Sequence, residues 1–172
     1  FKAVLDGAHE RGMKVIMDLV INHTSDQHEW FKKSAAGDPK YKDYYIWRPG
    51  KGKDGKRPPN NWMATFPGPG WQWNEERGEY YLHLFAVEQP DLNHDNPAVR
   101  EEVKDIMRFW LGMGVDGFRE DVITYISKRE GLPNGFPIPI MRGQEHYSPG
   151  PNIHKYLLEY RKVAEEFGAV QI

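Results

Sequence analysis

The chain has 172 residues, of which 39% are hydrophobic, and its formal net charge is −2 at pH 7. This length suffices for one ordinary domain with a sizeable core, and the composition excludes a disordered chain. Near-neutral charge gives no electrostatic basis for a nucleic-acid partner, and no apolar run is long enough to cross a membrane. The absence of cysteine excludes disulfides and thiolate metal sites, and it favours a cytoplasmic location.

Helices and strands alternate in the first part of the sequence until a long interruption. Residues 2–11 have apolar side chains at helical spacing, and Gly12 is a typical residue after a helix. The run KVIMDLVIN, residues 14–22, predicts a strand buried on both faces of a parallel sheet. From residue 24 to about 89, Pro, Gly, Lys and aromatic residues alternate, which predicts a loop-rich excursion with a hairpin near Gly78.

The alternation resumes in the second half of the chain. Asn96 and Pro97 predict a helix start, with Asn as cap and Pro at the first helical position, and the amphipathic pattern ends near Gly112. The run VDGFREDVI, residues 115–123, predicts a second buried strand. A loop rich in Gly and Pro then precedes an amphipathic helix at residues 153–167, and the closing AVQI begins another strand. This order predicts an α/β fold with parallel strands.

Polar residues stand at the carboxyl ends of the two predicted strands, where functional residues of parallel sheets gather. The first strand contributes Asp18 and His23, and the second contributes Arg119, Glu120 and Asp121 in succession. Because side chains alternate along a strand, Arg119 and Asp121 share a face and Glu120 points away. A structural Arg–Asp bridge would explain the pair. A guanidinium that keeps a carboxylate ionised for nucleophilic attack would explain it equally well.

Aromatic residues make up 13% of the chain, and many lie in stretches rich in Gly, Pro and Asn. Core packing is one explanation, since aromatic rings bury large areas. Aromatic side chains on loops are also typical of a ligand cleft, where a ring can stack against the apolar face of a sugar. The composition is compatible with both.

Three segments together resemble the signatures of one family. DLVINH (residues 18–23) is similar to the first signature of the α-amylase superfamily, and GVDGFREDVI (residues 114–123) is similar to its second. QPDLNHDNP (residues 89–97) resembles an additional signature of the oligo-1,6-glucosidase branch. The three occur in the family's order, so the chain is identified as a member of this superfamily.

The resemblance implies part of a (β/α)8 TIM barrel, from its second helix to the start of its fifth strand. Residues 1–23 and 89–172 would belong to the barrel, and residues 24–88 would form the inserted, loop-rich domain B. The abrupt starts and ends of the helical and strand patterns at Phe1 and Ile172 lead us to expect a longer parent chain.

The resemblance also implies roles for five residues. Asp121 would be the nucleophile that forms a covalent glucosyl-enzyme intermediate, and Arg119 would orient and ionise it. Asp18 and His23 would lie at the floor of the −1 sugar site, with His23 reaching a glucose hydroxyl. Val122, directly after the nucleophile, goes with α-1,6 cleavage in this branch, whereas Ala goes with α-1,4 cleavage.

The same resemblance implies which groups lie elsewhere. The family's acid/base glutamate would follow Ile172, so we expect the 172 residues alone to be inactive. Glu120 and Glu145 are poor substitutes, since one faces away from the nucleophile and the other lies in a loop. Asn22 matches a calcium-binding position of many α-amylases, but the oligo-1,6-glucosidase branch commonly lacks that site. We therefore expect no metal and no cofactor.

The resulting expectation is a retaining, exo-acting α-glucosidase that hydrolyses short α-1,6-linked glucosides, with a small oligosaccharide as its partner. Trehalose-6-phosphate hydrolases and sucrose isomerases share these motifs and remain alternatives. A non-catalytic scaffold with the same barrel is a further alternative, although such proteins typically lose the catalytic carboxylates. The oligomeric state stays open.

Overall fold

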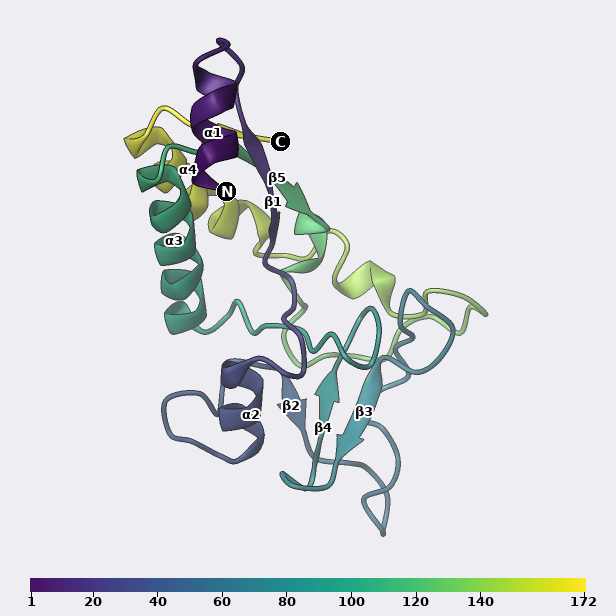
Figure 1. Cartoon of the computed structure of the whole chain (residues 1–172). Helices are drawn as coiled ribbons and strands as arrows, with labels where there is room; N and C mark the ends of the chain where they lie inside the picture. The colour runs from purple at the N-terminus through teal and green to yellow at the C-terminus, as the bar shows by residue number, and fades with distance from the viewer.

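The computed structural model describes residues 1–172 and contains two small sheets (Figure 1). The first sheet is parallel and has the strand order β1-β5-β6. Its strands are β1 (Ile16–Val20), β5 (Gly117–Asp121) and β6 (Val170–Gln171). The register places Asp18 beside Arg119 and Val20 beside Asp121. The carboxyl ends of β1 and β5 are therefore level with each other.

Three helices accompany the parallel sheet: α1 (Lys2–His9), α3 (Pro97–Gly112) and α4 (Ile153–Glu166). α3 starts as predicted, because the Asn96 side chain accepts a hydrogen bond from the Ala98 backbone N–H and Pro97 is the first helical residue. The apolar faces of α3 and α4 pack with β1 and β5 around a core that includes Leu19, Met107 and Tyr160. These helices cover one face of the sheet.

The second sheet is antiparallel and has the strand order β2-β4-β3. Its strands are β2 (Trp47–Arg48), β3 (Trp71–Asn74) and β4 (Glu79–Leu82). The hairpin predicted near Gly78 is present, with this glycine at a positive φ of 69°. A short helix, α2 (Glu29–Ala35), lies beside β2, and Figure 1 shows this unit below the parallel sheet.

Three details differ from the sequence expectation. β1 is not buried on both faces, since Ile16 is 43% and Val20 44% exposed. The reason is that β1 is an edge strand and helices cover only one face of its sheet. The predicted second strand ends at Asp121, because Val122 turns the chain with a φ of 44°. Within the loop-rich stretch, the sequence did not predict α2.

The loop that follows β5 joins the two sheets. It contains the short 3-10 helices η1 (Ile123–Tyr125) and η2 (Gln144–His146). Leu132 and Tyr147 from this loop share an apolar cluster with Trp62 and with residues of β3 and β4. The indole N–H of Trp62 donates to the Pro133 carbonyl over 2.7 Å. The strand ends of the parallel sheet are thereby held facing the second sheet.

Candidate active site

The predicted residues of β1 and β5 meet at one guanidinium. Nη1 of Arg119 donates to Asp18 Oδ1 over 2.8 Å and to Asp121 Oδ1 over 2.6 Å. The parallel register explains this contact, because Asp18 and Arg119 are direct neighbours and Asp121 lies two residues further on the same face. Both carboxylates raise the pKa of Arg119, with the Asp18 hydrogen bond as the larger cause.

These charges are accessible to solvent. The side chains of Arg119, Asp18 and Asp121 are 57%, 55% and 29% exposed. Arg119 and Asp121 therefore do not form a buried pair in this chain, because the face of the sheet that carries them is uncovered. Exposed ion pairs contribute only about 0–1 kcal/mol to stability, so stabilisation of the fold is a weak reason for these three charges.

His23 lies next to this group and is half-buried. Its Nε2 is 2.9 Å from the Gln89 amide nitrogen, and the other end of that amide accepts from the Ala86 backbone N–H. Gln89 therefore offers an N–H to Nε2, and the Asn22 amide nitrogen lies 3.3 Å from Nδ1 on the other side of the ring. Burial lowers the pKa of His23, and the carboxylates of Asp91 and Asp121 oppose this shift. The ring is neutral at pH 7.

Aromatic side chains that the motifs did not identify surround His23. The ring centroid of Phe85 lies 5.2 Å from that of His23 and 5.5 Å from that of Tyr125. Phe66, which is 55% exposed, packs edge-on against Phe85 at 6.4 Å. The sequence indicated these aromatic residues only through the general enrichment of aromatic residues in loops. That enrichment does not identify individual residues.

A buried ion pair that the sequence motifs did not predict lies behind His23. The Lys128 ammonium is 2.6 Å from Asp91 Oδ2 and 3.1 Å from Asn22 Oδ1, and the two charged side chains are 3% and 0% exposed. Asp91 also accepts hydrogen bonds from the Asn22 amide and the Leu84 backbone N–H. The carboxamide oxygen that the resemblance assigned to a calcium position thus faces an ammonium group. No three His, Asp or Glu side chains gather closely enough to hold a metal ion.

Val122 has an unusual backbone conformation. Its φ of 44° and ψ of 33° lie in the left-handed region, which β-branched residues rarely adopt. Strain of this kind amounts to about 1–3 kcal/mol and is found mainly at functional positions. The turn begins directly after Asp121, so it fixes the point at which the strand stops and η1 begins.

Glu120 and Glu145, the two carboxylates that are poor substitutes for the acid/base group, form hydrogen bonds elsewhere. Glu120 accepts from the Gln171 side chain over 2.6 Å on the other side of the sheet, which supplies the partner that the sequence could not identify. Burial raises its pKa, and the Gln171 hydrogen bond opposes that shift. Glu145 accepts from the Phe136 backbone N–H over 2.7 Å, within its own loop.

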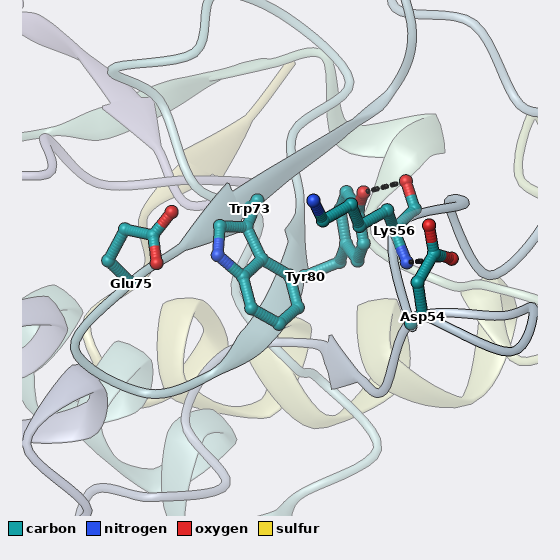
Figure 2. A pocket seen from close by; sticks show the side chains of 6 residues that line it. Asp54, Lys56, Trp73, Glu75 and Tyr80 are labelled. Carbon is teal, nitrogen blue, oxygen red and sulfur yellow. Dashed lines mark hydrogen bonds between the residues drawn. The ribbon is translucent and has the colours of Figure 1, made fainter.

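A separate cavity of 390 Å³ lies on the second sheet (Figure 2). None of the strand-end residues lines it; its walls are Asp54, Gly55, Lys56, Trp73, Glu75 and Tyr80. Among the helices of the chain, none has the length and apolar character that crossing a bilayer requires.

Comparison with known families gives a match over residues 1–171 to the family described as "Alpha amylase, catalytic domain". The oligo-1,6-glucosidase of Bacillus cereus is 56% identical over 163 residues, which cover 91% of this chain and 28% of that protein. The oligo-1,6-glucosidase of Parageobacillus thermoglucosidasius is 52% identical over 166 residues, which cover 94% and 29%. The chain thus spans less than a third of the length of these relatives.

Solved structures resemble the chain over nearly its whole length. The trehalose-6-phosphate hydrolase of Bacillus licheniformis has a TM-score of 0.92 at 44% identity, covering 99% of this chain and 30% of that one. The trehalulose synthase of Pseudomonas mesoacidophila has a TM-score of 0.90 at 42% identity, covering 99% and 31%. The predicted fold class, part of a TIM barrel, is confirmed by these similarities and by the parallel sheet with its helices.

Proposed function

From the premise that this chain belongs to the α-amylase catalytic-domain family, we propose that it forms part of a retaining α-glucosidase for short α-1,6-linked glucosides. Its similarity to oligo-1,6-glucosidases at 52–56% identity supports this substrate class. Residues 1–23 and 89–172 belong to the barrel in this proposal, and residues 24–88 form domain B. The organisation into two sheets supports that division.

The observation that carries the proposal is the bridge from Arg119 to Asp18 and Asp121 at level strand ends. In the reaction, an Asp121 carboxylate oxygen forms a bond to the anomeric carbon while the glycosidic C–O bond breaks. An acid group protonates the departing oxygen, and water then hydrolyses the glucosyl ester. Arg119 donates a hydrogen bond to Asp121 and orients this carboxylate for attack on the anomeric carbon.

A retaining glycosidase needs its two carboxyl groups about 5–5.5 Å apart. Glu120 and Glu145 are both engaged elsewhere. The resemblance to the family, of whose members the chain spans less than a third, leads us to assign the acid/base role to a glutamate outside these 172 residues. Asp18 and His23 then form the floor of the sugar site. Because Gln89 occupies Nε2 of His23, Gln89 must turn aside for Nε2 to reach a sugar hydroxyl.

Val122 supports the choice of linkage. Its β-branched side chain narrows the space beside the nucleophile on the aglycone side. A difference of one or two methyl groups in such a pocket changes the discrimination between two substrates by about 1–3 kcal/mol. The likeness to a trehalose-6-phosphate hydrolase makes that activity the second candidate, so the test must include its substrate. The cysteine-free composition supports a cytoplasmic location.

The test is glucose release from isomaltose, maltose and trehalose 6-phosphate by the intact protein and by Asp121→Asn. We expect isomaltose to be preferred and kcat in the variant to fall by about 10⁴-fold or more, because the covalent step is lost. Glu120→Gln is the matched control, since it neutralises the adjacent carboxylate on the opposite face. Activity that survives in Asp121→Asn would refute the nucleophile assignment, and preference for trehalose 6-phosphate would favour the second candidate.

A further inference from the structure

We propose that the cavity between β3, β4 and the 51–57 loop is a second saccharide-binding site, separate from the strand-end site. Its volume of 390 Å³ falls in the range of about 300–1,000 Å³ that small-molecule sites occupy. Figure 1 places the turn between β3 and β4 at the end of the second sheet that lies away from β1 and β5. A sugar held here would not occupy the space above Asp121.

Two aromatic rings form a corner of the cavity. Trp73 and Tyr80 are direct neighbours across β3 and β4, and their ring centroids lie 5.2 Å apart at an interplanar angle of 67°. Trp73 is half-buried and keeps part of its ring at the cavity wall, whereas Tyr80 is 92% buried and supports it. The apolar face of a pyranose ring can stack on such a platform, which is a common role for aromatic rings in binding sites.

The polar groups of the cavity suit the hydroxyls of a sugar. Figure 2 shows the indole nitrogen of Trp73 on the edge that faces the Glu75 carboxylate. The indole N–H can only donate and the carboxylate can only accept, so one hydroxyl placed between them would satisfy both. The Trp62 and Trp71 N–H groups, by contrast, bond to protein oxygens. The Lys56 ammonium supplies a further donor on the opposite side of the Trp73 ring.

The wall that carries Lys56 is held in shape before any ligand arrives. The Tyr80 hydroxyl donates to the Lys56 carbonyl over 2.7 Å, and the Lys56 backbone N–H donates to Asp54 over 3.2 Å. Both bonds appear in Figure 2. The charged groups of the lining are two carboxylates, Asp54 and Glu75, and the Lys56 ammonium, so the cavity offers both acceptors and donors and disfavours an anionic ligand. Donors and acceptors together beside an aromatic platform suit a hydroxyl-rich molecule such as a saccharide.

The probe for this site is isomaltotriose, added to the intact protein with Asp121→Asn so that the sugar is not consumed. Tryptophan is labelled with fluorine for ¹⁹F NMR, and the Trp73 signal is identified by its loss in Trp73→Phe. We expect the Trp73 signal to shift in a saturable manner. Glu75→Gln should weaken this titration by roughly tenfold, about 1.4 kcal/mol, because one charged acceptor is lost.

Glu76→Gln is the matched control, because Glu76 is the next residue on the same turn, is exposed and does not line the cavity. It should leave the Trp73 titration unchanged. A Trp73 signal that stays constant as the sugar saturates other tryptophans would overturn the proposal, as would equal weakening by Glu75→Gln and Glu76→Gln. The test does not require hydrolysis, so its outcome is independent of the proposed glucosidase activity.

Discussion

At the scale of single residues, Val122 combines a strained backbone with a position next to the proposed nucleophile. We expect Val122→Ala to raise kcat/KM for maltose relative to isomaltose by about 10-fold, since removal of two methyl groups widens the aglycone side. The backbone should keep its left-handed turn, because η1 and β5 fix it on both sides. The measurement is kcat/KM for both disaccharides with the intact protein.

A Val122→Thr variant serves as control, because it keeps the branched shape and should retain the isomaltose preference. An unchanged ratio of the two kcat/KM values in Val122→Ala would show that linkage preference depends on other residues. Phe66 and Phe85 would then be the next residues to test, since their rings lie beside His23 and the loop that follows β5.

At the scale of elements, the buried Lys128–Asp91 pair ties three segments together: the end of β1 through Asn22, the segment before α3, and the chain after η1. Lys128→Met would leave the Asp91 carboxylate buried without a counter-charge. We expect a loss of about 3–5 kcal/mol in the free energy of unfolding, measured by urea denaturation of the intact protein.

The double variant Lys128→Met with Asp91→Asn distinguishes the lost charge from lost packing. It should recover a large part of the stability, because no unpaired charge remains buried. A Lys128→Met variant as stable as the parent would show that the ion pair does not hold these three segments together.

His94 connects two other elements and makes stability depend on pH. Its imidazole contacts the Ile21 carbonyl over 2.7 Å and the Tyr160 hydroxyl over 2.8 Å, which links the end of β1 to α4. The pKa of His94 is lowered to about 3, mainly by burial; the hydrogen bond to the Ile21 carbonyl opposes this shift, and the charges of Lys128 and Arg100 add to it. In the unfolded chain the imidazole regains a pKa of about 6.5.

Between about pH 6.5 and 3, His94 is therefore protonated in the unfolded chain but neutral in the folded protein. The free energy of unfolding decreases as the pH falls through this range. We expect His94 to lower the free energy of unfolding by about 2 kcal/mol as the pH falls from 7 to 5. His94→Gln removes the titrating group, and its stability should change less over this interval by about that amount. Urea denaturation at both pH values measures the difference. Equal pH dependence in parent and variant would contradict the assignment.

The sequence predicted the elements whose patterns are local. The helix cap at Asn96, the hairpin at Gly78 and the alternation of helices with strands follow from neighbouring residues, and so does the shared face of Arg119 and Asp121. It did not predict Lys128, because the partner of this residue, Asp91, lies 37 positions earlier and nothing local marks the pair. The burial of β1 was mispredicted for a related reason: an apolar strand does not reveal which of its faces other elements cover.

At the scale of the whole molecule, the parallel sheet leaves two edges open. β1 and β6 are its outer strands, and the large apolar side chains Ile16, Val20 and Val170 are between 43% and 52% exposed. Unpaired strand edges with exposed apolar residues promote pairing between chains. We therefore expect the 172-residue polypeptide, produced by itself, to self-associate in a concentration-dependent manner.

Size-exclusion chromatography with light scattering over a range of concentrations measures this association. Val20→Lys places a charge on the exposed edge of β1 and should shift the equilibrium towards the monomer, because a charged edge strand pairs poorly with another chain. Val4→Lys is a matched control, since it makes the same substitution at a valine that is 70% exposed on α1 rather than on a strand. A constant monomer mass in the parent polypeptide at every concentration would contradict the prediction. Association that Val20→Lys leaves unchanged would instead locate the contact on another surface, such as the exposed Phe109 face of α3.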